Sequence, residues 1–445
     1  MAKENKKVIR GWIFYDWANS VYNLVISSAV FPIYYNTITK NQYLENVGRE
    51  QLLPNEIVKV DFFGYQISSE SLFSYILSLS FLVVSLLSPL LSGVADYLGN
   101  KKKFLQFFCY LGSFACISFF FFEKVPLELG MLSVFLASIG FWNSLVFYNA
   151  YLPEIAAPRM HDLISAKGFT MGYFGSMILL IICLLIITFV GGEYTRYCFL
   201  LVGVWWMSFA QITFRALPKN TPKPAPAEKK NRIILQGIYS LVAVFKEFKK
   251  TKRLKRFLIS FFFYNTGVQT VMLMAVIFAD KEVMWPKDGG KTGLIISILL
   301  IQILGAAGAM LMSRISGKIG NIRTLTVVVF MWICICVAAY FVSRPVGFYF
   351  LAASVGLVMG GVQALSRSTY SKMLPKTHDT TSYFSFYDAT EKIGIVFGTF
   401  FFGFASQLFG SMRYSVISIA IFFILGLICL FFVPKEEIVY NETNE

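Results

Sequence analysis

Four polar residues stand close together near the start of the chain, in a stretch that is otherwise apolar. Asn19, Ser20 and Asn23 follow Asp16 at steps of three, four and seven residues, so a helix would place all four on one stripe. A carboxylate inside such a helix can take up and release a proton, which makes Asp16 the candidate for proton coupling. Two other interpretations stay open: a helix-end carboxylate near water, or one paired with a nearby Lys or Arg.

Polar side chains recur in three later apolar stretches. Asn143 and Tyr148 lie in one, Asn265 and Gln269 in another, and Gln363 in a third. A polar face is costly against lipid, so we expect these faces to point inward and to contact a polar solute. The predicted binding residues are Asn19, Tyr22, Asn23, Asn143, Tyr148, Asn265, Gln269 and Gln363. For each amide the alternative is that it only joins neighbouring helices.

Charged residues form a second group, late in the chain. Its members are Arg367, Lys372, Asp388, Glu391 and Lys392. Opposite charges on neighbouring helices can form a pair that breaks when the helices separate, and we expect Arg367 and Asp388 to be such a gate pair, with Glu391 beside them. The alternative is static charge pairing at a membrane face.

Apolar blocks long enough to cross a bilayer must position these residues. Of the 445 residues 56% are hydrophobic and 15% charged, with a mean hydropathy of +0.62. A bilayer-spanning helix needs about 20 apolar residues. Twelve blocks fit: Ile9–Ile38, Ser71–Ala95, Phe104–Phe122, Leu127–Tyr151, Ser165–Val190, Tyr194–Ala216, Phe257–Phe278, Thr292–Ile315, Leu325–Val342, Val346–Tyr370, Tyr383–Leu408 and Tyr414–Val433.

The blocks divide into two related halves, residues 1–216 and 257–445, joined by a basic linker, 217–256. Pro153 and Pro375 end the fourth and tenth blocks, and Gly99 and Gly320 follow the second and eighth at nearly the same offset. Parallel repeats of six spans predict an all-α membrane fold with a solute site between the halves. In such folds the first, fourth, seventh and tenth spans line the cavity, and these spans carry the polar faces.

Residues 92–102 resemble the loop motif of the major facilitator superfamily, in which an acid, a glycine and basic residues latch neighbouring helices. Asp96, Gly99 and Lys101 match the motif, whereas Tyr97 and Asn100 stand at usual basic positions. The resemblance implies that Asp96, Gly99 and Lys101 act in gating. Residues 316–323 are a more degenerate second copy.

Lys and Arg concentrate on one side of the predicted spans and in the linker. The positive-inside rule then places both termini in the cytoplasm. The basic run 245–257 fits either an amphipathic segment on anionic lipid or a solvated linker that enforces this topology.

The remaining features argue against other classes of protein. The net charge of +15 lies between the spans, so it does not indicate nucleic-acid binding. The cysteines show no metal-ligand spacing, no phosphate-binding loop occurs, and we expect no cofactor. A membrane-embedded enzyme would need a nucleophile or metal site inside the spans, yet both histidines lie in predicted loops. A membrane sensor or scaffold remains a second alternative, although no large soluble domain favours it.

Longer stretches resemble one branch of the superfamily: the bacterial "Unknown Major Facilitator" proteins and the fungal vacuolar effluxers that release amino acids after autophagy. The matching stretches are 11–20, 147–153, 360–368 and 386–388, together with Gly168, Gly172 and Tyr173. Two positions depart from the branch: Thr266 replaces an acidic residue, and Glu391 replaces a glycine.

These observations together predict a secondary active transporter that moves a small polar solute across the bilayer by alternating access. The resemblance implies amino acids as candidate substrates. With no nucleotide site, a gradient must supply the energy, and protons are the expected coupling ion. We expect a multi-pass protein of a bacterial inner membrane.

Overall fold

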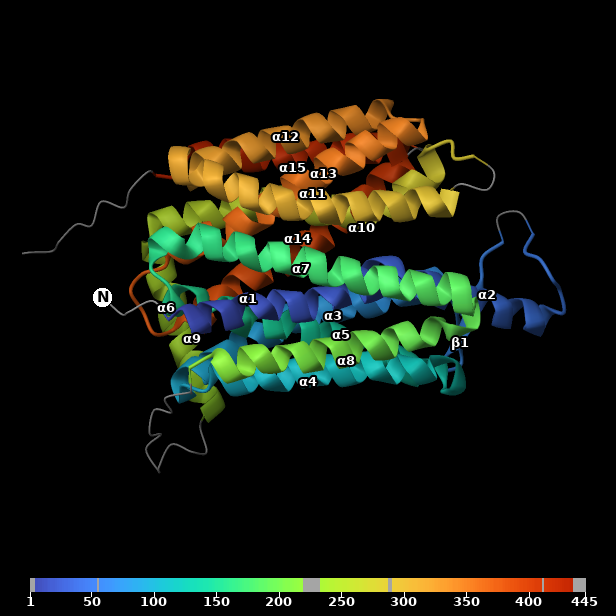
Figure 1. Cartoon of the computed structure of the whole chain (residues 1–445), viewed down its shortest axis with the longest axis horizontal. Coiled ribbons are helices and arrows are strands. Elements are labelled where there is room, and N and C mark those ends of the chain that lie inside the picture. Colours follow the sequence, from blue (N-terminus) through green and yellow to red (C-terminus); the bar gives the residue numbers. More distant parts are fainter. Residues whose placement is uncertain (1–4, 54–55, 219–232, 287–289, 410–411, 435–445) are drawn as a thin grey trace, which may run out of the picture.

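Long helices run side by side through the molecule and group into two halves (Figure 1). The computed structural model describes residues 5–53, 56–218, 233–286, 290–409 and 412–434. After the first passage, the N-terminal half contains α3 (Ser69–Leu98), α4 (Lys101–Ser118), α5 (Leu127–Asn149), α7 (His161–Leu185) and α8 (Thr195–Ala216). The C-terminal half contains α10 (Lys252–Glu282), α11 (Gly290–Ile319), α12 (Asn321–Phe341), α13 (Pro345–Met373), α14 (Thr380–Phe409) and α15 (Met412–Phe431).

Short helical pieces complete the connections. They are η2 (Phe119–Lys124), α6 (Leu152–Ile155), η3 (Pro158–Met160), η4 (Ile186–Val190) and η5 (Gly192–Tyr194). Eleven helices of the described ranges are long and apolar enough to cross a membrane.

The first passage is one rod made of three pieces, which adds a twelfth passage to those eleven. The pieces are α1 (Lys6–Val21), the π-helix η1 (Tyr22–Ala29) and α2 (Phe31–Val47). The wider π turn absorbs an extra residue, and π turns are common at functional sites. The rod continues past the predicted end at Ile38 and stops at Gly48, whose φ of 65° suits glycine.

A small β-hairpin follows, where only a loop was expected. Strand β1 (Lys59–Phe62) pairs antiparallel with β2 (Tyr65–Ser68), and Val60 lies opposite Ile67. Phe63 and Gly64 turn the chain with φ of 52° and 81°. The Phe63 amide donates to Glu128 at 3.0 Å, which ties the hairpin to the start of α5.

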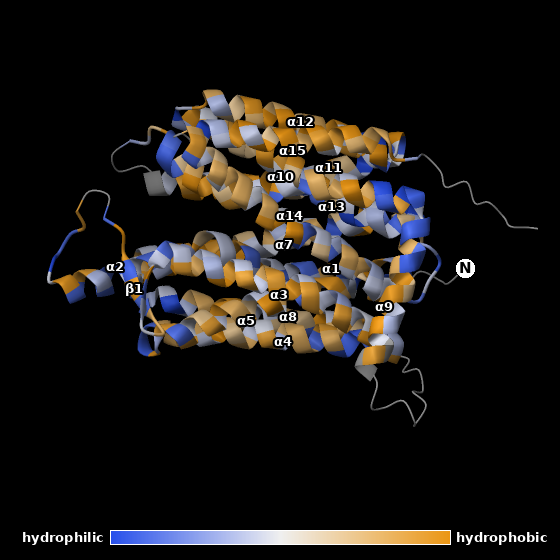
Figure 2. Cartoon of the chain, turned by 180° about the vertical axis from the view of Figure 1, so that it is seen from behind, coloured by the Kyte–Doolittle hydropathy of each residue, from blue (hydrophilic) through white to orange (hydrophobic). Residues whose placement is uncertain are grey.

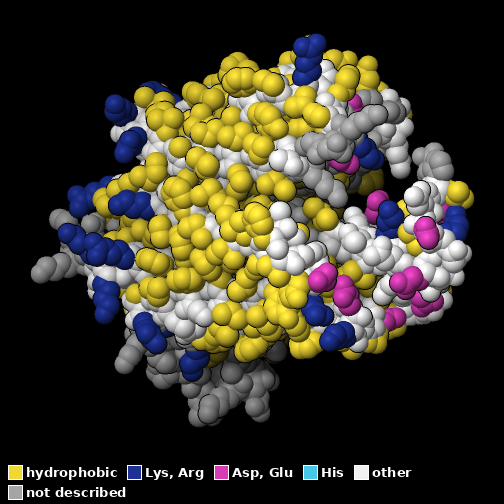
Figure 3. All heavy atoms as spheres, turned by 45° about the vertical axis from the view of Figure 1, so that its right-hand side comes forward, with side chains coloured by type: hydrophobic (Ala, Val, Ile, Leu, Met, Phe, Trp, Pro, Cys, Tyr) yellow, Lys and Arg dark blue, Asp and Glu magenta, His cyan; other side chains and the backbone are white. Residues whose placement is uncertain are grey.

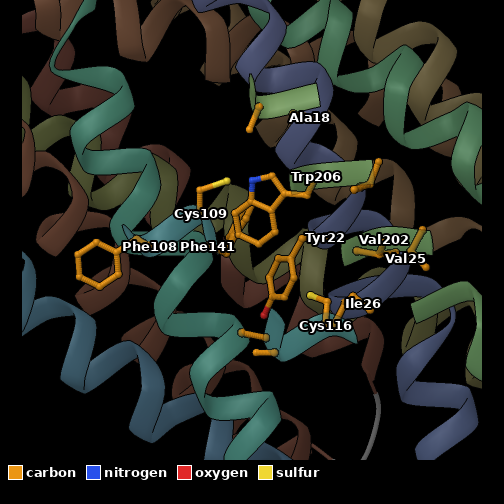
Figure 4. Close-up of a cluster of buried hydrophobic side chains, with 14 of the residues drawn as sticks. Ala18, Tyr22, Val25, Ile26, Phe108, Cys109, Cys116, Phe141, Val202 and Trp206 are labelled. Carbon is orange, nitrogen blue, oxygen red and sulfur yellow. The ribbon is translucent and has the colours of Figure 1, made fainter. Parts of the chain in front are cut away.

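Each half has its own apolar core. Figure 4 shows that of the N-terminal half, where Tyr22 stacks on Phe141 with ring centroids 4.6 Å apart, close to Trp206. Small residues let helices approach: a Cβ on Gly140 would lie 2.4 Å from the Gly112 amide nitrogen, between α5 and α4. Such contacts suit membrane helices, because apolar burial alone does not drive association in lipid.

The linker contains a helix, α9 (Ile233–Lys250), which begins well before the basic run 245–257 where an amphipathic segment was one of the two expectations. It runs across one end of the bundle, roughly at right angles to the long helices (Figure 2). Helix α10 then begins at Lys252, earlier than the expected Phe257. The expected proline-rich part of the linker, residues 219–232, lies outside the described residues.

The outer surface separates by charge and polarity. A broad apolar flank covers the middle, Lys and Arg gather at one end, and most visible Asp and Glu lie at the other (Figure 3). We call the end where α1 begins and α15 finishes the terminal end, and the opposite end, which carries β1 and β2, the hairpin end.

Candidate functional site between the two halves

A buried ion pair joins the two halves about two to three helical turns in from the terminal end. The Arg367 Nη2 atom of α13 lies 3.0 Å from the Asp16 Oδ2 atom of α1, and the two side chains are 4% and 6% exposed. Nη1 lies 3.5 Å from the other carboxylate oxygen. Buried charges need partners, so this contact holds α1 against α13.

The N-terminal half supplies the other Arg367 contacts that build this site. Ser165 on α7 accepts hydrogen bonds through its hydroxyl and its carbonyl, both at 2.9 Å, and Asn149 Oδ1 accepts one at 3.3 Å. The guanidinium carbon lies 4.2 Å from the centroid of the Phe169 ring, a cation–π distance. The guanidinium group of Arg367, in the C-terminal half, is therefore surrounded by polar and aromatic groups of the N-terminal half.

Asp16 is positioned by aromatic residues. Tyr148 on α5 donates to Asp16 Oδ2 at 2.9 Å, and Trp12 donates through its indole nitrogen to the Tyr148 carbonyl at 2.9 Å. The Trp12 and Tyr148 rings stack with centroids 4.4 Å apart. Gly168 leaves room for the pair: a Cβ there would lie 2.2 Å from Asp16 Oδ2 and 2.9 Å from Arg367 Nη2.

The pairing predicted between Arg367 and Asp388 is wrong. Arg367 lies on the face of α13 that meets the N-terminal half, whereas Asp388 Oδ1 is bonded to Lys392 Nζ, one turn further along α14, at 3.1 Å. Of the interpretations left open for Asp16, pairing with a basic residue is the one observed.

A second buried charge cluster lies where α14 meets α5. Lys392 is almost fully buried, and its Nζ lies 3.3 Å from Glu391 Oε1 and 3.5 Å from the centroid of the Trp142 ring. Gln269 on α10 donates to Glu391 at 3.4 Å. The Oδ2 atom of Asp388 is buried and has no hydrogen-bond partner among the described residues. We call these five residues, Asp388, Glu391, Lys392, Gln269 and Trp142, the Lys392 cluster.

The other predicted binding residues differ in their location and in their hydrogen-bond partners. Gln363 accepts from Tyr173 at 2.9 Å across the halves, and the buried Asn265 has an amide nitrogen without a partner in the described chain. Asn19 is buried beside Ser20, and Asn23 is exposed. Asn143 is buried and donates to Ile139 of its own helix.

One binding residue needs correction. Tyr22 lies inside the apolar core of the N-terminal half instead of facing the other half (Figure 4). The wider turn of η1 follows directly on α1, so a strict α-helical spacing does not hold past Val21.

The predicted loop motif forms a contact between the halves, which we call the first latch. Asp96 at the end of α3 accepts from the Ser382 amide at 2.7 Å and its hydroxyl at 2.8 Å, in the first turn of α14. A carboxylate is favourable there because the helix N-terminus carries partial positive charge. Gly99 ends α3 with φ of 66°, and Lys101 pairs with Glu154.

A second latch involves Ser316 of the degenerate motif copy 316–323, but its acid, Asp162, was not predicted. Asp162 in the first turn of α7 accepts from Lys372 at 2.5 Å, Asn321 at 2.7 Å and Ser316 at 3.1 Å, all in the C-terminal half. His161, expected in a surface loop, is buried beside it at the start of α7.

Both latches contain a hydrogen bond between an aspartate and a serine, but the two residue types stand at exchanged positions. Asp96 bonds Ser382, and Ser316 bonds Asp162, and the same sequence interval separates Asp96 from Ser316 as separates Asp162 from Ser382. Acid and serine have therefore changed places between the halves.

Sequence reasoning missed Ser165, Gly168, Trp142 and Asp162 as parts of these contacts. The quoted family stretches did include Gly168. No group of three or more His, Cys, Asp or Glu side chains in the described ranges could hold a metal ion.

The architecture is the major facilitator fold. Over 97% of this chain and 99% of the other, it matches the crystal structure of FucP in the outward conformation, with a TM-score of 0.67 and 12% identity. The xylose symporter XylE also gives a TM-score of 0.67, with 12% identity over 96% of this chain and 94% of XylE.

The sequence defines the family within this class. Residues 4–439 match the family described as "Vacuole effluxer Atg22 like", and the chain belongs to it. The uncharacterized MFS-type transporter YxiO of Bacillus subtilis is 28% identical over 98% of this chain and 97% of its own length. Autophagy-related protein 22 of Yarrowia lipolytica is 24% identical over 87% of this chain and 80% of its own length. The chain is a multi-pass integral membrane protein of the transporter type.

Proposed function

We propose that this protein is a proton-coupled secondary transporter of small polar solutes, with amino acids as the first candidates. The observation that carries the proposal is the buried ion pair of Asp16 and Arg367 between the halves. A transporter that rocks its halves must break such a contact in every cycle. Protonation of Asp16 removes its charge and leaves Arg367 without its carboxylate partner, so proton binding favours separation of α1 from α13.

The Lys392 cluster supports the choice of substrate class. It places one ammonium group and two carboxylates on α14 against Trp142 of the other half. A site with charges of both signs suits a solute that also carries both, such as an amino acid. Gln269 and Asn265 add amide groups that bond to either end of it.

Orientation follows from charge. Lys and Arg gather at the terminal end, and by the positive-inside rule we propose that this end faces the cytoplasm of a bacterium. In the proposed cycle, the ion pair and both latches close the cytoplasmic side, and they open when the site turns inward.

The test is uptake of radiolabelled amino acids by proteoliposomes under an imposed pH gradient. Asp16→Asn should abolish the part of uptake that the gradient drives, whereas Glu193→Gln, at an exposed carboxylate, should leave it intact. Gradient-driven uptake that survives in Asp16→Asn would show that Asp16 does not couple protons. A folded protein that moves neither amino acids nor other small solutes would contradict the transporter itself.

A further inference from the structure

Helix α9 has two apolar faces, and only one of them is covered by the residues that the structure describes. Gly237, Val244 and Phe248 are buried. Gly237 packs on α3, where a Cβ would lie 2.8 Å from the Val94 nitrogen, and Phe248 contacts Phe386 of α14. Because α3 and α14 belong to different halves, α9 bridges the halves at the terminal end.

The second apolar stripe has no cover among the described residues. Its members recur every three or four residues along α9, so they lie on one side of the helix. They are Leu235 at 48% exposed, Ile238 at 37%, Tyr239 at 65%, Val242 at 43% and Phe245 at 42%. A helix bathed in water would carry polar residues along this stripe.

The depth of α9 fits a membrane interface. A Cβ on Gly93 of α3 would lie 2.3 Å from the Gly237 carbonyl oxygen, and α3 continues only to Leu98. The contact therefore lies within the last two turns of a membrane-spanning helix, not beyond its end. Helix α9 therefore crosses the bundle at the level of the last turns of α3 (Figure 2), where amphipathic interfacial helices are found.

Lysines accompany the exposed stripe. Lys246, Lys249 and Lys250 are exposed in the last turns of α9, and Lys249 Nζ lies 4.6 Å from the centroid of the Phe245 ring. Further basic residues follow at once in α10, beginning with Lys252 and Arg253. Long basic side chains beside an apolar stripe can reach headgroup phosphates while their stems stay in the apolar layer.

We propose that α9 lies in the inner interface of the membrane and binds anionic phospholipid, with the stripe 235–245 in the acyl boundary and Lys246, Lys249 and Lys250 on the phosphates. Charge complementarity decides the occupant, because a zwitterionic lipid would engage the stripe but has no net negative charge to attract the lysines. This site does not depend on what the protein transports.

The location is tested by spin labels on the reconstituted protein. Val242→Cys and its neighbour Ala243→Cys, both exposed, point to different sides of α9. They are compared in a background where Cys334 and Cys429 are replaced by serine. In vesicles of phosphatidylcholine and phosphatidylglycerol, dissolved oxygen should enhance the spin relaxation of the label at position 242. A water-soluble nickel reagent should instead enhance the spin relaxation of the label at position 243. Equal access of the nickel reagent to both labels would overturn the proposal.

Lipid selectivity is tested with a dye at Val242→Cys in detergent-solubilised protein. Added phosphatidylglycerol should change the dye fluorescence, and phosphatidylcholine should not. The variant K246Q/K249Q/K250Q should raise the phosphatidylglycerol midpoint at least about tenfold. The control K40Q/K59Q/K124Q, which loses the same charge at the hairpin end, should keep the original midpoint. A midpoint that stays the same in the α9 variant would overturn the anionic selectivity.

Discussion

At the scale of single residues, the contact between Asp16 and Arg367 is the one on which the closed arrangement of the halves and the proposed proton coupling depend. Each is buried in the interface between halves, so replacing one leaves the other as a buried charge without its partner. We expect Arg367→Asp or Asp16→Arg alone to destabilise the closed arrangement by about 3–5 kcal/mol. The double exchange should recover a large part of the loss, as seen by thermal unfolding in detergent. Additive losses would show that the two charges act independently.

Gly168 provides a second test of the same pair without changing any charge. A methyl group there would lie 2.2 Å from Asp16 Oδ2, so Gly168→Ala should push the carboxylate away from Arg367. Gly317→Ala is the matched control, because a Cβ at Gly317 would meet nothing within 4 Å. We expect a lower unfolding temperature and weaker transport for Gly168→Ala only. Equal behaviour of the two variants would contradict the tight packing described for Gly168.

Glu56 gives a residue-scale prediction about pH at the hairpin end. The Leu53 amide, followed by Arg49 and Tyr43, lowers the pKa of Glu56 from 4.5 to about 2. Because the folded pKa is depressed, this carboxylate stabilises its loop at pH values above 4.5. The stabilisation is lost as pH falls from 4.5 towards 2. Hydrogen exchange of residues 49–53 should rise over that range and should already be fast at neutral pH in Glu56→Gln.

At the scale of elements, the two latches should act together to keep the terminal end closed. Spin labels at Lys103 and Lys376, exposed positions in different halves, would report the distance between the halves. We expect Asp96→Ala and Asp162→Ala each to populate longer distances, and the double variant to do so further. Asp61→Ala, at the hairpin end, is the control. Distances that do not change in the double variant would show that the latches do not hold the halves together.

At the scale of the whole molecule, the charge asymmetry predicts a topology. Lys59 lies at the hairpin end and Lys318 at the terminal end, and both are exposed. In intact bacteria, an impermeant maleimide should label Lys59→Cys at once and Lys318→Cys only after the membrane is opened. The reverse pattern would show that the terminal end faces outward.

The sequence predicted the architecture well because long apolar blocks have one physical solution in a bilayer. It placed Asp16 and Arg367 on inward faces but not opposite each other, because pairing depends on how two halves dock. Periodicity also failed at Tyr22, where η1 changes the helical spacing and turns the ring into the core. Helix α9 was missed because its apolar residues end at a run of charges that begins at Lys246, so the apolar stretch falls short of a span.

The exchange of acid and serine between Asp96–Ser382 and Ser316–Asp162 has a consequence for ancestry. Two halves that arose by duplication would begin with the same donor and acceptor at both ends. Here the same kind of bond occurs in both halves, but the acid and the serine that form it stand at exchanged positions. The copy at 316–323 is degenerate in sequence because it contributes a serine, Ser316, to its bond, where the first copy contributes its acid, Asp96.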